Sequence, residues 1–84
     1  MTSEDSFTDL RYLMSEADAR YGDFASTHEA LGVAMEEWHE LIDAIRANDI
    51  GAIQLECMDL AAVLMRLANQ LAVDDSAIVK RSLK

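Results

Sequence analysis

The sequence contains no proline and only three glycines among its 84 residues. Because these two residues interrupt helices most strongly, their scarcity favours long helices. The single cysteine, Cys57, cannot form a disulfide within the chain, so we expect a reducing, cytoplasmic location. No stretch of about 18 residues is apolar and free of charge, so we expect no membrane-spanning segment. The opening residues, MTSEDSFTDL, have neither a basic region nor an apolar run, so we expect no signal peptide.

Positive charge is also scarce. Seven lysines and arginines face 16 aspartates and glutamates, which gives a formal net charge of −9. Nucleic-acid phosphates and anionic membranes repel such a chain, so we expect neither as a partner. The acid excess fits three roles: solubility, a cation site, or imitation of nucleic acid.

Apolar residues, by contrast, are abundant. They make up 51% of the sequence, which is a high share for so short a soluble chain. A chain of this length forms a single domain, 1–84, and leaves much apolar surface uncovered. Self-association is the simplest way to cover that surface, so we expect an oligomer.

Turn-forming residues divide the chain into four expected helices. The turns lie at 21–26, 48–51 and 73–76, and the helices lie roughly at 4–20, 27–47, 50–72 and 75–83. Ser26 and Glu29 form a capping box that starts the second helix. Asn48 tolerates the left-handed conformation of a helix stop, and Asp49 can cap the third helix. The sequence therefore predicts an all-α fold.

The third helix, 50–72, is apolar over more than half of its circumference, which is typical of a buried helix. Its narrow polar stripe consists of Glu56, Asp59, Arg66 and Gln70. We expect this stripe to face an interior or a cleft. Buried carboxylates are costly unless they are paired or bind a metal, so Glu56 and Asp59 are candidate metal ligands.

Four acids are placed symmetrically about the second turn. Glu40 and Glu56 each lie eight residues from Asn48, while Glu37 and Asp59 each lie eleven residues from it. In an antiparallel hairpin these pairs stand at matching heights, roughly 12 and 16 Å from the turn. Because each helix carries its two acids three residues apart, each pair shares one helix face.

Four carboxylates at one level repel one another unless a cation compensates them. Magnesium prefers oxygen ligands and is commonly held by carboxylates together with substrate phosphates. The symmetry therefore predicts a metal site. The alternative is a solvated acidic face, which describes the neighbouring Glu36, Asp43 and Asp49 at least in part.

The stretch EEWHELIDAIRANDIGAIQLECMD, residues 36–59, resembles the paired EExxE and ExxD motifs of the MazG-like all-α nucleoside triphosphate pyrophosphohydrolases. Fifteen residues separate Glu40 from Glu56, which is within the range of that family. The similarity extends on both sides, through HEALGVAMEEW and DLAAVLMRLANQLAVDD. It covers roughly His28 to Asp75.

The resemblance implies a four-helix MazG-like fold that assembles as a homodimer or a homotetramer, in which a partner chain completes the helical bundle. It implies cleavage of a nucleoside triphosphate to the monophosphate and pyrophosphate with Mg²⁺, for which Mn²⁺ is a possible substitute. The expected role is nucleotide-pool housecleaning. Carried over by position, Glu37, Glu40, Glu56 and Asp59 hold the metal and carry catalysis, and Glu36 is an accessory acid.

The sequence departs from the family pattern at Arg66, where many relatives have an asparagine seven residues after the last acid. Arg66 either contacts a substrate phosphate or forms a salt bridge with Glu56 or Asp59. Lys80 and Arg81 either supply further phosphate contacts or belong to a solvated tail.

Two other functions fit the sequence. One is a non-catalytic acidic helical protein that binds a protein partner or mimics DNA, and the other is a helical metal-binding module without turnover. Among the aromatic residues, Trp38 fits a core or dimer interface better than a base-stacking role. Tyr21 and Phe24 fit either helix packing or the wall of a base pocket.

Overall fold

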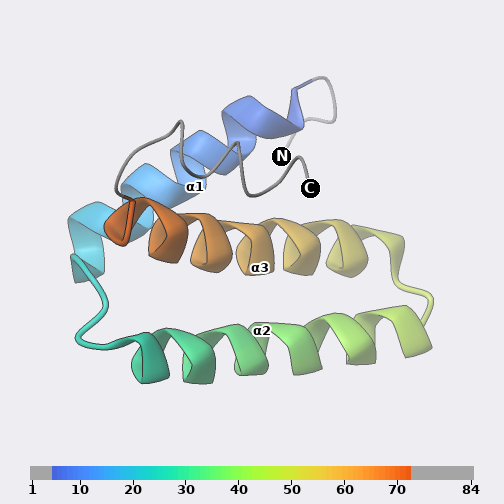
Figure 1. Cartoon of the computed structure of the whole chain (residues 1–84). Helices are drawn as coiled ribbons and strands as arrows, with labels where there is room; N and C mark the ends of the chain where they lie inside the picture. The colour runs from blue at the N-terminus through green and yellow to red at the C-terminus, as the bar shows by residue number, and fades with distance from the viewer. Residues whose placement is uncertain (1–4, 73–84) are drawn as a thin grey trace, which may run out of the picture.

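A computed structural model describes residues 5–72 of the chain. Within that range the protein is all-α, with no strand, and consists of α1 (Ser6–Tyr21), α2 (Thr27–Arg46) and α3 (Ile50–Gln70) (Figure 1). These helices confirm the first three that the sequence predicts, with each end within two residues of its predicted position. The fourth expected helix, 75–83, lies outside the described residues.

The central helix of the described chain is α3. Both α2 and α1 pack against it, whereas the backbones of α1 and α2 do not approach each other closely. The chain reverses between α2 and α3, so these two helices form an antiparallel hairpin, and α1 lies across the other side of α3 (Figure 1).

The turn of the hairpin forms as the sequence predicts. Asn48 adopts a left-handed conformation, with a φ of 54°. The Asp49 side chain then accepts a hydrogen bond of 3.2 Å from the backbone N–H of Ala52, which caps the start of α3. The reversal therefore depends on two adjacent polar residues that satisfy their own backbone requirements.

The start of α2 is a capping box, as expected. Ser26 Oγ accepts a 3.0 Å hydrogen bond from the backbone N–H of Glu29. The Glu29 carboxylate in turn accepts a bond of 3.2 Å from the backbone N–H of Ala25. Two otherwise free amides are thus satisfied, which fixes the residue at which α2 begins.

The core is small. Its main cluster consists of Phe24, Ala30 and Val63, and Leu41, Ala44 and Ala62 are also buried. α1 contributes no buried residue at all. Because an isolated helix of this length is marginal in water, α1 needs attachment to the rest of the fold. No helix within residues 5–72 has both the length and the apolar character needed to cross a bilayer.

Candidate functional site

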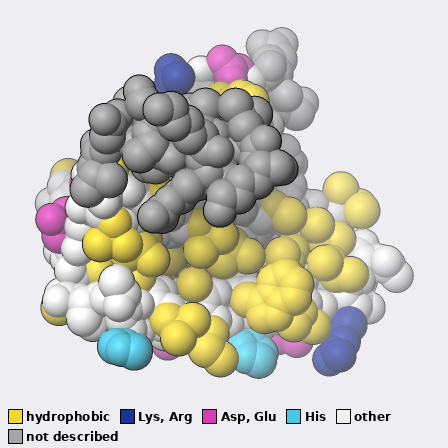
Figure 2. Space-filling view, in the orientation of Figure 1, with side chains coloured by type: hydrophobic (Ala, Val, Ile, Leu, Met, Phe, Trp, Pro, Cys, Tyr) yellow, Lys and Arg dark blue, Asp and Glu magenta, His cyan; other side chains and the backbone are white. Residues whose placement is uncertain are grey.

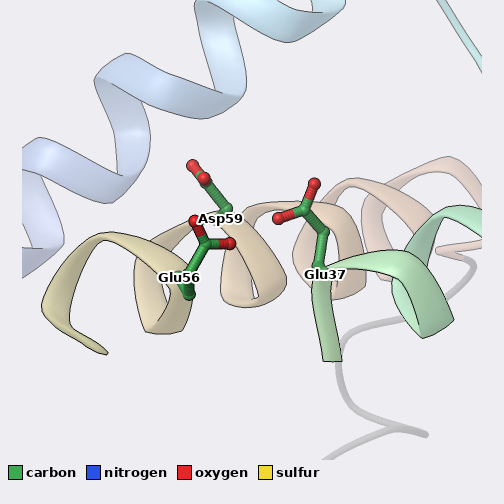
Figure 3. Close-up of side chains that lie close together, drawn as sticks. All are labelled: Glu37, Glu56 and Asp59. Atoms are coloured by element: carbon green, nitrogen blue, oxygen red, sulfur yellow. The ribbon is translucent and has the colours of Figure 1, made fainter. Parts of the chain in front are cut away.

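Three of the four predicted acids come together on the hairpin. Glu37 of α2 and Glu56 and Asp59 of α3 each place one carboxylate oxygen within 4.8 Å of the other two. Figure 3 shows their carboxyl groups gathered on one side of the two helices. We refer to these three residues as the acid group, and its geometry is that of a site that can hold a metal ion.

The hairpin explains this convergence. Glu37 and Asp59 are equally distant from the turn along the chain, and Glu56 lies one turn from Asp59 on the same face of α3. Glu40 lies one turn nearer the hairpin end, where its side chain is exposed and stays outside the acid group. It still lies near the acid group, because it contributes to the raised pKa of all three members.

The acid group carries uncompensated negative charge. Burial raises the pKa of Glu37 to about 7, and the negative charge of Glu40 and a hydrogen bond with Glu56 add to the rise. Burial also raises the pKa of Glu56, with a further contribution from a hydrogen bond with Glu40. The pKa of Asp59 is raised by burial and by the charge of Glu40. The folded chain therefore holds these carboxylates in a setting that disfavours their charged form.

Two oxygens of the acid group lack any partner in the protein. Glu37 Oε2 and Glu56 Oε2 are buried and accept no hydrogen bond. A buried acceptor without a partner costs free energy, and a bound cation is one group that can provide that partner. Among the described side chains the one ion pair joins Arg66 to Asp18, so no basic side chain neutralises the acid group. A hard divalent cation with oxygen ligands fits this donor set.

A cleft of about 500 Å³ opens beside the acid group, between α1 and the α2–α3 hairpin. Glu37 and Asp59 lie on its wall, so two of the three acids face it. Its apolar lining includes Leu13, Ala17, Val33, Ala62 and Val63. Glu16 and Arg20 of α1 add polar groups on the opposite wall. The cleft therefore combines an apolar surface with a potential cation at one side.

Arg66 also lines the cleft, and its guanidinium is engaged by the protein. Its Nε donates a 2.8 Å hydrogen bond to Asp18 Oδ1, and its Nη2 donates one of 2.7 Å to the carbonyl oxygen of Gly22. The guanidinium also lies 4.7 Å from the centre of the Phe24 ring. The expected salt bridge with an acid of α3 is wrong in its partner, because α1 crosses α3 here and supplies Asp18.

Other predicted site residues lie apart from the acid group. Glu36 is exposed and is not a member of it. Lys80 and Arg81, which the sequence offered as phosphate contacts, lie outside the described residues.

The aromatic residues divide between core and surface. Phe24 is buried in the main cluster and packs under Arg66. Tyr21 lines the cleft and is 70% exposed, while Trp38 is 50% exposed on α2. Trp38 is therefore not part of the core of a single chain.

Sequence reasoning assigned no role to three residues of the site region. Asp18 and Arg20 lie on α1, whose placement across α3 no local pattern indicates. Gln70 was recognised as part of the polar stripe, but without a role. Gln70 Oε1 accepts a 2.8 Å hydrogen bond from the backbone N–H of Phe24, and Gln70 Nε2 donates one of 2.9 Å to the carbonyl oxygen of Phe24.

Comparison with known proteins returned no matching family model, no matching curated protein and no matching solved structure. Function must therefore be argued from the residues and from their arrangement.

Proposed function

We propose that this protein is a divalent-metal-dependent hydrolase that cleaves a nucleoside triphosphate to the nucleoside monophosphate and pyrophosphate. The observation that carries the proposal is the acid group: three uncompensated carboxylates, with two buried orphan oxygens, beside a cleft. The spacing of these acids is that of the paired motifs in the MazG-like enzymes. Nucleotide-pool housecleaning in the cytoplasm is the role that this reaction suits.

The acids have distinct parts in this proposal. Glu37, Glu56 and Asp59 hold Mg²⁺, with Mn²⁺ as a substitute, because their oxygens are already gathered within 4.8 Å. When bound, the metal offsets negative charge on the phosphate oxygens. Glu40 is exposed and stands outside the three ligands, so it is available to orient the attacking water or to complete the ligand set.

The cleft suits a small ligand. Its volume of about 500 Å³ falls within the range of small-molecule sites, roughly 300–1,000 Å³. Its apolar lining offers a surface for a base and sugar, while the acid group faces the phosphates. Arg20 lies on the opposite wall of the same cleft, and its exposed guanidinium is suited to a phosphate oxygen.

We further propose that the enzyme is a homodimer or a homotetramer. Leu31, Met35, Trp38 and Ile45 recur at helical spacing on α2, and each is at least 50% exposed. Figure 2 shows hydrophobic side chains gathered over α2 and along its seam with α3. A row of exposed large apolar side chains is typical of an interaction site, and we infer that a second copy of this chain covers it.

The decisive experiment is a panel of common and modified nucleoside triphosphates with Mg²⁺, scored for pyrophosphate release. Glu56→Gln and Asp59→Asn should abolish release, whereas Asp43→Asn, at an exposed acid of α2 outside the acid group, should not. Metal binding without pyrophosphate release from any triphosphate would identify a metal-binding module instead. Activity that survives both substitutions would remove the acid group from catalysis.

A further inference from the structure

The polar stripe of α3 continues beyond the acid group and serves a second purpose there. Arg66 and Gln70, one turn apart, make every side-chain hydrogen bond that joins distant parts of the described chain. All four bonds end on α1 or on the loop that follows it. We refer to Arg66 and Gln70 as the loop clamp.

The backbone of this loop is arranged to receive the clamp. Gly22 ends α1 with a φ of 69° and a ψ of −158°, a conformation open essentially only to glycine. That turn leaves the Gly22 carbonyl oxygen free of the helix, and Arg66 Nη2 donates to it at 2.7 Å. Two residues later, the Gln70 amide satisfies both the N–H and the carbonyl oxygen of Phe24. Only a side chain with both a donor and an acceptor can do this.

α1 depends on these contacts because it buries no side chain of its own. Arg66, by contrast, is only 8% exposed, and its ion pair with Asp18 holds the last turns of α1 against α3. α1 also supplies one wall of the cleft, through Leu13, Glu16 and Arg20. The position of the loop in the clamp therefore sets the position of the α1 wall of the cleft.

We propose that Arg66 and Gln70 are positioning residues, which fix the α1 wall of the cleft opposite the acid group and so set the fit of the substrate. This inference rests on the proposed function. It also gives Arg66 a task other than phosphate contact, since its Nε and Nη2 are already donated to Asp18 and Gly22. No hydrogen bond or ion pair of the clamp reaches the acid group, so we expect metal binding to be independent of it.

The first test measures, by hydrogen exchange and without an activity assay, whether the clamp protects the backbone of the loop. In the full-length protein, the backbone amide of Phe24 should exchange its hydrogen about tenfold faster, or more, in Gln70→Ala than in the wild type. Gln70→Glu keeps the acceptor and loses the donor, so its rate should be intermediate. Asn69→Ala, an exposed neighbour on the same turn, is the matched control and should leave the rate unchanged. An unchanged Phe24 rate in Gln70→Ala would overturn the clamp.

The second test separates positioning from phosphate contact. Gln70→Ala and Asp18→Asn should each raise KM for the triphosphate by about tenfold while kcat and Mn²⁺ affinity are retained. These substitutions leave the Arg66 side chain intact. If only Arg66→Lys and Arg66→Ala raise KM, Arg66 is a phosphate ligand and the proposal is wrong. If the wild type releases no pyrophosphate, the proposed function fails while the amide exchange still decides the clamp.

Discussion

At the scale of single residues, the proposed metal-binding role of the acid group requires charges that destabilise the metal-free protein. Burial and mutual repulsion raise the pKa of Glu37, Glu56 and Asp59, so the metal-free protein holds charge where charge is disfavoured. A protein without this function gains by losing those charges. A cation that completes the site would remove this cost.

Neutralising one of these acids should therefore stabilise the metal-free protein. We expect Glu56→Gln to raise its free energy of unfolding by about 0.5–1 kcal/mol, through relief of repulsion. Mg²⁺ should raise the melting temperature of the wild type and have little effect on this variant. Thermal unfolding with Mg²⁺ and with a chelator measures both effects, and Glu36→Gln is the control. Equal stabilisation of wild type and variant by Mg²⁺ would place the metal elsewhere.

The stability of the metal-free protein should also depend on pH in a definite direction. Folding raises the pKa of Glu37 from 4.5 to about 7, so the folded state binds this proton more tightly than the unfolded state. The resulting stability is complete below pH 4.5 and is lost as the pH rises toward 7. Glu40, Glu56 and Asp59 supply the facing charges.

Urea unfolding in the presence of a chelator, from pH 5 to pH 8, measures this dependence. We expect a loss on the order of 1–3 kcal/mol over that range, reduced by solvent screening. Glu37→Gln should flatten the curve. Mg²⁺ should reverse the slope, because binding requires deprotonated ligands. A wild type whose stability rises with pH without metal would contradict the arrangement of the acids.

Most of the acid group was predictable from the sequence, because its members are related by the geometry of a helical hairpin. Glu37, Glu56 and Asp59 follow from counting residues on either side of Asn48, although the same count also includes Glu40, which lies outside the acid group. The partner of Arg66 did not follow, because Asp18 belongs to a helix whose position across α3 is set by contacts between distant segments.

At the scale of secondary-structure elements, local chemistry fixes where the helices end. Ser26 with Glu29, Asn48 and Asp49 are local signals, and each acts in the structure as the sequence predicts. The crossing of α1 over α3 has no such signal, since α1 buries no residue. A weakly packed helix is the one whose placement sequence reasoning cannot derive.

Two glycines should respond oppositely to the same substitution. Gly22→Ala has open space around the added methyl group, but the positive φ of 69° makes the backbone strained, so we expect a loss of about 1–3 kcal/mol. Gly32→Ala also meets open space but lies inside α2, so we expect a gain of about 0.5–1 kcal/mol. Urea denaturation of both variants checks the pair. A neutral Gly22→Ala would mean that the turn after α1 is not held in this conformation.

At the scale of the whole molecule, the exposed apolar stripe of α2 is the feature that a single chain leaves unexplained. Trp38→Glu places a charge at the middle of that stripe and should dissociate the oligomer, so that light scattering gives the 9.3 kDa of one chain. Phe7→Glu on α1, where the side chain is 76% exposed, is the control and should preserve the assembly. A wild type that is monomeric at micromolar concentration, or an assembly lost only in Phe7→Glu, would remove α2 from the interface.

The equal count of residues on the two arms of the hairpin has a consequence for length. One extra residue between Glu37 and Asn48 would turn Glu37 by about 100° and move it about 1.5 Å along α2, away from Asp59. A matching change in the other arm before Glu56 is needed to bring the acids back to one height, and only whole helical turns also restore their direction. The acids of the two helices therefore meet in only one register of the hairpin. The sequence of the turn can change, but the segments of α2 and α3 between the turn and the acids can lengthen only together.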